Sequence, residues 1–232
     1  MLVIAHRGAS GDFPENTLAA FVAAAEASAD MCEFDVRMTR DGALVVIHDE
    51  TVDRTSDGRG EVGAMDLGEI KRLDAGIWFS ARFEGQRIPT LAEVAATVRG
   101  RCGLVVELKN PSIEFEALEV LRRQGVVKDT IILSFDRPQI SRLSALKEAP
   151  RTGLLVDRER DGIVEAALAA GASAVCLQFR VASPALCAKA RRSGLAVFVW
   201  TVDDEDLMRH FIAAEIDGIM TNYPGRLSRL LG

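Results

Sequence analysis

Short apolar runs alternate with amphipathic stretches along almost the whole chain. The apolar runs are bounded by turn residues, which is typical of buried β-strands, and the stretches between them carry apolar residues at helical spacing. The predicted strands cover residues 2–5, 31–37, 43–47, 104–109, 130–134, 152–156, 174–179, 196–201 and 217–221. The predicted helices cover residues 17–29 (with Asn16 as N-cap), 67–73, 91–98, 115–124, 139–146, 162–170, 184–192, 205–214 (with Asp203 or Asp204 as cap) and 224–231.

This alternation gives about eight strand–helix units, with no linker-like stretch and no change of composition between the two halves. No glycine-rich phosphate-binding fingerprint favours an open doubly wound sheet. The pattern therefore predicts an α/β fold, a single (β/α)8 TIM barrel over residues 1–232. Residues 51–89 interrupt the rhythm and are too long for an ordinary connection, so we expect an inserted subdomain there. Because it follows His48 directly, we expect it at the catalytic mouth.

Composition and charge narrow the class of partner. The formal net charge is −6 and 48% of residues are hydrophobic, which favours a large core and argues against binding to nucleic acid or an anionic membrane. No run approaches a membrane span and no signal-peptide pattern is present, so we expect a cytoplasmic protein without stable membrane association. The four cysteines have no zinc-ligand spacing and are expected to be buried free thiols: Cys32, Cys102, Cys176 and Cys187. The oligomeric state is left open.

Charged residues stand at alternate positions inside otherwise apolar strands. Glu33 and Asp35 share one face of a strand, and Glu107 and Lys109 share one face of the next barrel strand. Charges in a plain core are costly, whereas a barrel mouth that binds a cation explains them together. Three carboxylates form an oxygen-rich site suited to Mg²⁺ or Ca²⁺, with Mn²⁺ as a further candidate. The alternative is that these acids form salt bridges with Arg7, Arg37 and Lys109.

Two of the three histidines, His6 and His48, also follow strands at this end of the barrel, whereas His210 falls within a helix and is expected to have no role. Two imidazoles beside a metal suit hydrolysis of a phosphoryl ester, because one can accept a proton while the other donates one. Arg7 and Lys109 would stabilise charge on the phosphate oxygens. Which histidine is the base, and whether water or a substrate hydroxyl attacks, are open questions.

Several motifs resemble those of the glycerophosphodiester phosphodiesterase family. They are His6-Arg7-Gly8 with Pro14-Glu15-Asn16-Thr17, Glu33-Phe34-Asp35-Val36, Thr39-Arg40-Asp41-Gly42, His48-Asp49, Arg54-Thr55 with Gly58 and Gly60, Ile88-Pro89-Thr90-Leu91, Glu107-Leu108-Lys109, Trp200-Thr201-Val202, and Asp217-Gly218-Ile219 to Tyr223-Pro224. The resemblance spans essentially the whole chain. It is dense in the first 110 residues and loose between about 111 and 195.

The resemblance implies a barrel enzyme that hydrolyses small glycerophosphodiesters to sn-glycerol 3-phosphate and an alcohol. The short chain resembles bacterial cytosolic members and not secreted or membrane-bound ones. It implies His6 and His48 as the acid–base pair, Glu33, Asp35 and Glu107 as ligands of a divalent cation, and Arg7 and Lys109 as phosphate contacts. Trp200 is expected to line the substrate pocket, with plain barrel packing as the alternative. The alcohol group is not defined.

Two other functions remain to be weighed. A lysophospholipase D-type or phospholipase C-like enzyme acting on lipids would share this barrel, but the sequence has no membrane anchor and no evident exposed apolar helix. A catalytically inactive ligand-sensing barrel would be expected to have lost a histidine or a carboxylate, and this chain retains all of them.

Overall fold

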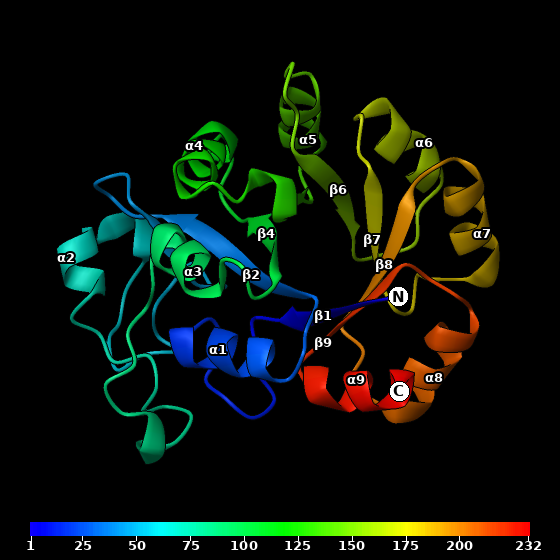
Figure 1. Cartoon of the computed structure of the whole chain (residues 1–232). Helices are drawn as coiled ribbons and strands as arrows, with labels where there is room; N and C mark the ends of the chain where they lie inside the picture. The colour runs from blue at the N-terminus through cyan, green and yellow to red at the C-terminus, as the bar shows by residue number, and fades with distance from the viewer.

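The computed structural model describes all 232 residues and shows a closed barrel surrounded by helices (Figure 1). Eight strands run parallel: β1 (Leu2–His6), β2 (Met31–Met38), β4 (Gly103–Leu108), β5 (Thr130–Ser134), β6 (Arg151–Val156), β7 (Ala174–Gln178), β8 (Ala196–Trp200) and β9 (Gly218–Thr221). The barrel closes because β1 pairs with β2 on one side and with β9 on the other. The predicted (β/α)8 barrel is confirmed.

A helix follows each barrel strand, and together these helices cover the outside of the sheet. They are α1 (Leu18–Glu26), α3 (Leu91–Val98), α4 (Glu114–Gln124), α5 (Arg137–Ser144), α6 (Ile163–Ala169), α7 (Pro184–Arg192), α8 (Glu205–Ala213) and α9 (Pro224–Leu231). Asp204 caps α8 by accepting a hydrogen bond from the Leu207 N–H, which decides between the two predicted caps. None of the helices is both long and apolar enough to cross a membrane.

Side chains on the barrel strands alternate between two cores, as their sequence pattern predicts. On β2, Phe34 and Val36 point outward and join the core between strands and helices. The smaller core inside the barrel contains Ile4, Met31, Val105, Ile131, Leu133, Leu155, Ala174, Cys176, Phe198 and Met220. The polar residues of β2 and β4 therefore follow apolar ones along the interior face, toward the C-terminal ends of the strands.

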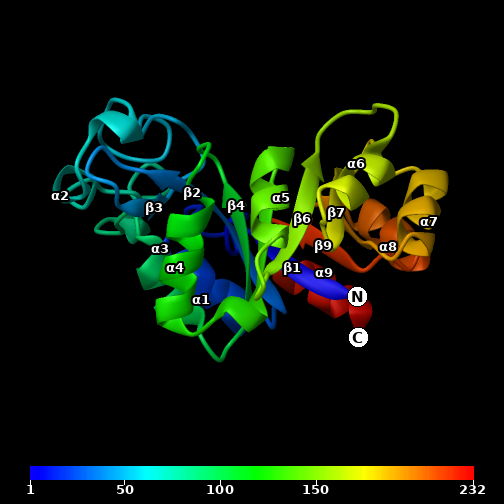
Figure 2. The same ribbon diagram turned by 90° about the horizontal axis from the view of Figure 1, so that it is seen from above.

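The segment between β2 and α3 projects from one side of the barrel (blue to cyan in Figure 2). It begins with the short strand β3 (Leu44–Val46), which pairs antiparallel with β2, and includes the single-turn helix α2 (Leu67–Ile70). It has a small core of its own, made of Val45, Ile47, Val52, Val62, Ile70, Ala75 and Ile88. Within it, the Asp74 carboxylate accepts hydrogen bonds from the backbone N–H groups of Gly76, Ile77 and Gly85.

The cysteines follow the sequence prediction with one exception. All four are free thiols, and Cys32, Cys176 and Cys187 are buried. Cys102 is only half-buried, so its predicted burial is wrong. It stands immediately before β4, where its sulfur lies 3.4 Å from that of Cys32.

Candidate active site

Strand pairing brings the predicted site residues of β1, β2 and β4 side by side. His6 is paired in register with Glu33, and Asp35 is paired with Glu107. Lys109 follows directly after β4, and its backbone N–H donates to the Val36 carbonyl. These residues lie at the C-terminal ends of the strands, the face on which (β/α)8 barrels carry their active sites.

The carboxylates of Glu33, Asp35 and Glu107 form one buried cluster. A carboxylate oxygen from each lies within 4.8 Å of one from each of the other two, and all three residues are buried. Burial and the neighbouring acids raise the pKa of Glu33 well above its usual range and raise the pKa of Glu107 to about 7. The pKa of Asp35 is lowered despite its burial, because Arg7 and Lys109 lie beside it.

Ordinary ion pairing accounts for only part of this cluster. Lys109 Nζ lies 3.1 Å from Asp35 Oδ1 and 2.5 Å from Glu107 Oε1, and Arg7 Nε lies 3.2 Å from Asp35 Oδ2. Glu33 accepts a hydrogen bond from the Arg7 backbone N–H, but no Lys or Arg side chain pairs with it. Arg37, the third cation proposed for such pairing, instead donates to the His48 carbonyl.

The loop from Arg7 to Asn16 carries two more groups to Asp35. Arg7 and Asn16 both adopt left-handed backbone conformations, with φ of 56° and 59°, and the Asn16 N–H closes the loop on the Arg7 carbonyl. The Asn16 side chain donates to Asp35 Oδ2 at 3.0 Å. The predicted N-cap was therefore wrong: Thr17, whose hydroxyl accepts from the Ala20 N–H, caps α1, while Asn16 belongs to the site.

Side chains from the loops that follow β8 and β9 fix the orientation of the His6 ring. His6 Nδ1 lies 2.8 Å from Asn222 Oδ1, while Asn222 Nδ2 donates to Asp203 Oδ2 at 2.6 Å. Because a carboxylate can only accept, the amide oxygen must face His6, so Nδ1 carries the ring proton and Nε2 is left with its lone pair. Burial and the Arg7 charge lower the pKa of His6 to about 4.

His48 stands two residues beyond β3 and is held in the same tautomer by a different partner. Its Nδ1 donates to Asp49 Oδ1 at 2.6 Å. Burial lowers the pKa of His48, although Asp35 and Asp49 oppose the shift. His210 is exposed on α8 and has no part in this group.

A pocket of about 100 Å³ opens at this end of the barrel. Its polar side consists of His6, Arg7, Glu33, His48, Glu107 and Lys109, and its apolar side of Leu133, Phe135, Leu155, Trp200 and Met220. Trp200 both lines the pocket and packs in the barrel, the two alternatives considered for it. Its indole N–H donates to the Cys176 carbonyl. Its ring packs edge-to-face against Phe135, at 6.0 Å between centroids.

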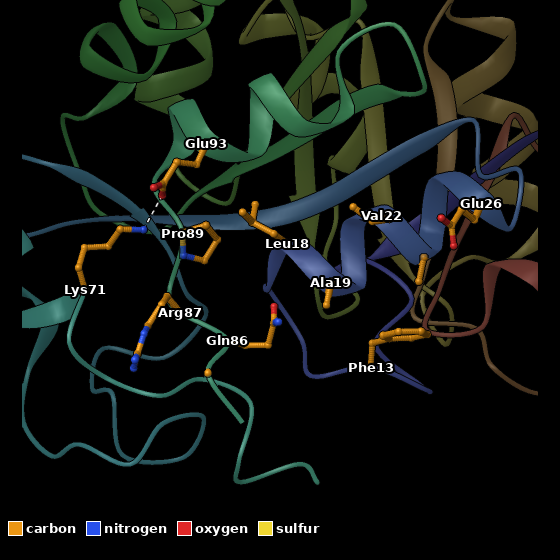
Figure 3. Close-up of a pocket in the computed structure, with 12 residues that line it drawn as sticks. Phe13, Leu18, Ala19, Val22, Glu26, Lys71, Gln86, Arg87, Pro89 and Glu93 are labelled. Atoms are coloured by element: carbon orange, nitrogen blue, oxygen red, sulfur yellow. Dashed lines mark hydrogen bonds and ion pairs between the residues drawn. The ribbon is translucent and has the colours of Figure 1, made fainter. Parts of the chain in front are cut away.

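A larger groove, of about 700 Å³, lies elsewhere, between the outer face of α1 and the segment 85–93 (Figure 3). Leu18 and Val22 form part of its apolar wall, and a Lys71–Glu93 ion pair of 2.6 Å lies at its edge. None of the predicted site residues lines this groove, so the larger cavity is separate from the chemistry.

Sequence reasoning identified the polar residues that face the pocket but missed those that hold them in place. Glu15 accepts a hydrogen bond from Arg7 Nη1 at 2.9 Å, and Arg54 contacts both Glu15 and Asp49. Their motifs were visible, but the contact that joins them, between Arg54 and Glu15, spans 39 residues and cannot be read from spacing. Phe135, which lines the pocket, was not singled out because an exposed aromatic after a strand carries no local signal.

The acidic cluster fits a divalent cation. Its ligands are hard oxygens, as Mg²⁺, Ca²⁺ and Mn²⁺ prefer, and a cation would offset the burial and the mutual repulsion that raise the pKa values of Glu33 and Glu107. Asp35 Oδ1 and Asn16 Oδ1 are buried oxygens without a well-aligned hydrogen bond. A bound cation or its water ligands would satisfy such acceptors.

Ionisable side chains gathered at the C-terminal mouth of a parallel barrel are typical of (β/α)8-barrel enzymes. The model of the glycerophosphoryl diester phosphodiesterase family matches residues 6–226. The chain therefore belongs to that family.

Individual relatives agree in length and fold. A glycerophosphodiester phosphodiesterase of Caldanaerobacter subterraneus subsp. tengcongensis is 41% identical, with 99% of this chain and 97% of the relative covered. The structure of one from Agrobacterium tumefaciens has a TM-score of 0.86 at 33% identity, covering 97% of this chain and 98% of that chain. The structure of an Oleispira antarctica phosphodiesterase in complex with the product sn-glycerol-3-phosphate has a TM-score of 0.92 at 28% identity. The match covers 98% of this chain and 95% of that chain.

Proposed function

We propose that this protein hydrolyses small glycerophosphodiesters to sn-glycerol 3-phosphate and an alcohol. The observation that carries the proposal is the convergence of His6, His48 and the cluster of Glu33, Asp35 and Glu107 on one pocket. The product bound in the Oleispira antarctica relative is the product expected here.

The hydrogen bonds of the two histidines support a distinct role for each in the reaction. Both imidazoles hold a proton on Nδ1, so Nε2 is the atom of each that exchanges a proton with substrate or nucleophile. His6, neutral at pH 7 because its pKa is lowered to about 4, accepts the proton of the attacking hydroxyl. Burial lowers the pKa of His48, but the Asp49 carboxylate opposes this by stabilising the imidazolium form, which donates a proton to the leaving alkoxide.

Glu33, Asp35 and Glu107 are proposed to hold a divalent cation, Mg²⁺, Ca²⁺ or Mn²⁺. When bound, it would supply positive charge that stabilises the non-bridging phosphate oxygens. Arg7 and Lys109 face the same space and add fixed charge for the same oxygens. Trp200 lines the opposite, apolar side, where it would pack against the carbon skeleton of the substrate.

Lipid substrates are not favoured by the structure. The apolar side of the pocket consists of only five side chains, and no apolar groove that could hold an acyl chain is continuous with the predicted site residues. An inactive ligand-sensing barrel is equally disfavoured, because the structure brings both histidines and all three carboxylates together.

We also propose that residues 51–89 form a subdomain that borders the mouth. Arg82 Nη2 donates to the Asp12 carbonyl, and the Phe83 ring packs against Phe13 at 5.3 Å between centroids. Both partners belong to the loop that carries Arg7. None of residues 51–89 lines the pocket itself, so their contact with the site runs through this loop and through Arg54.

Product analysis on a panel of glycerophosphodiesters, with and without chelator, tests the proposed function. We expect sn-glycerol 3-phosphate together with the free alcohol, and loss of both in chelator. Release of a phosphorylated alcohol, or unchanged hydrolysis in exhaustively chelated protein, would contradict it. Detection of a cyclic glycerophosphate would show that a substrate hydroxyl, and not water, attacks first.

A further inference from the structure

The Arg54 guanidinium, on the segment that follows His48, pairs with two carboxylates at once. Nε lies 2.7 Å from Asp49 Oδ2 and Nη2 lies 3.1 Å from Asp49 Oδ1. On its other side, Nη1 lies 2.8 Å from Glu15 Oε2 and Nη2 lies 2.8 Å from Glu15 Oε1. These contacts engage all three nitrogens of the planar guanidinium, one carboxylate on each of two sides, and fix the orientation of both carboxylates.

Each of these carboxylates in turn holds a group that faces the pocket. Asp49 Oδ1 accepts the Nδ1 proton of His48 at 2.6 Å, and Glu15 Oε1 accepts from Arg7 Nη1 at 2.9 Å. The result is one continuous chain of hydrogen bonds from His48 through Asp49, Arg54 and Glu15 to Arg7. Arg54 does not line the pocket, so it acts on the site only through these partners.

We propose that Arg54 is a positioning residue, which sets His48 and Arg7 at a fixed separation across the mouth. The inference rests on the proposed function, in which His48 donates a proton to the leaving group while Arg7 contacts the phosphate. Without the guanidinium, Asp49 and Glu15 would be two like charges at the rim with no shared partner, and each would be free to rotate away. A lysine cannot replace it, because one ammonium cannot engage both carboxylates in paired contacts.

Kinetics of Arg54→Ala and Arg54→Lys test the proposal, with Arg59→Ala as the matched control. Arg59 lies on the same segment, with a side chain 90% exposed and only a 4.0 Å pair to Asp53. We expect kcat to fall on the order of 10- to 100-fold in both Arg54 variants and to stay unchanged in Arg59→Ala. We also expect methylguanidine to restore part of the activity of Arg54→Ala and none of that of Arg54→Lys, whose side chain fills the site.

A double-mutant cycle separates positioning from general destabilisation. Because Arg54 acts on His48 through Asp49, the loss in Arg54→Ala combined with Asp49→Ala should be far smaller than the product of the single losses. Multiplicative losses, wild-type kcat in Arg54→Ala, or failure of methylguanidine to restore any activity would each overturn the proposal.

An NMR measurement made without substrate can test the role of Arg54 separately from the proposed hydrolytic function. The chain has three histidines, so the ring nitrogens of His48 can be assigned by NMR with a His48→Ala reference. In Arg54→Ala we expect the Nδ1 proton of His48 to exchange faster with water, while the His210 signals stay in place. An unchanged His48 signal would overturn the positioning role. A changed signal in a protein that hydrolyses no glycerophosphodiester would uphold the role of Arg54 and contradict only the proposed function.

Discussion

His6 and Asn222 are 216 residues apart in the sequence, and their side chains meet with 2.8 Å between Nδ1 and Oδ1. The Asp203 carboxylate fixes Asn222 by accepting hydrogen bonds from both its side-chain Nδ2 and its backbone N–H. The ring of His6 is thus oriented by residues that follow β8 and β9, whereas its Nε2 lies 4.0 Å from Glu33 Oε2 on β2.

The first prediction concerns this orientation. Asn222→Ala removes the acceptor for His6 Nδ1 and allows the other tautomer, so kcat should fall on the order of 10- to 100-fold with KM little changed. Steady-state kinetics, with a thermal melt as control for folding, measure it. In a His6→Ala background the same change should have almost no further effect. A full additional loss there would mean that Asn222 acts independently of His6.

Replacing the histidines themselves should have larger effects. His6→Ala and His48→Ala should each lower kcat on the order of 10²- to 10⁴-fold while the fold survives, because each removes a proton-transfer group. His210→Ala, on the outer helix α8, is the matched control and should retain wild-type turnover. The assignment fails if either pocket variant keeps near-normal kcat while His210→Ala is impaired.

The carboxylates should govern dependence on metal. Chelation should abolish hydrolysis, and Mg²⁺, Ca²⁺ or Mn²⁺ should restore it. Glu107→Gln removes one anionic ligand and should raise the cation concentration needed for half-maximal activity. Titration of chelated wild-type and variant protein measures the shift. A variant with the wild-type titration curve would assign Glu107 another role.

A variant in the inserted segment, residues 51–89, can show whether this segment only supports the barrel or also recognises the alcohol group of the substrate. Phe83 packs against Phe13 and lies 5.7 Å from Phe79 between ring centroids, away from the pocket. Phe83→Ala should therefore lower kcat/KM by a similar factor, within about twofold, for choline, ethanolamine and other head groups. Ile77→Ala, at an exposed position of the same segment, is the control. A change in the order of preference would show that the segment reads the alcohol.

The stability of the same segment should depend on pH through Asp74. Burial would raise its pKa, but hydrogen bonds from the N–H groups of Gly85, Gly76 and Ile77 prevail and lower it. A carboxyl with a lowered folded-state pKa stabilises the fold above its unfolded pKa of about 3.9, and this contribution disappears as pH falls through the folded value. Asp74→Asn should cost about 1–3 kcal/mol at pH 7 and less at about pH 3. Urea unfolding at both pH values measures the difference, and an equal cost at the two would contradict the mechanism.

The barrel could be predicted from the sequence because the pattern that defines it, an apolar strand followed by an amphipathic helix, is local and is repeated along the chain. On β2, for example, the alternation of Glu33 and Asp35 with Phe34 and Val36 fixes which face is polar without knowledge of any partner. The same locality caused the error at Asn16. Asn16 and Thr17 both suit an N-cap, and only the contact with Asp35, on the next strand, distinguishes them.

Positioning contacts were beyond prediction for the same reason. The bonds from Asn222 to His6 and from Arg54 to Glu15 join residues that no periodicity relates. At the other end of the barrel, Cys102 shows that a local sequence pattern can also predict burial wrongly. An apolar neighbourhood in sequence predicted burial, but the residue stands in a connection just before β4, where the surface begins.

The place of β1 between β2 and β9 has a consequence for the order in which the molecule is made. During synthesis β1 emerges first, yet one of its two edges stays without a partner until residues 218–221 have left the ribosome. A nascent chain therefore exposes open sheet edges throughout elongation, which is a hazard for aggregation. The His6 ring likewise has no partner until Asn222 has been synthesised, so no nascent chain that stops before residue 222 carries a fully assembled site.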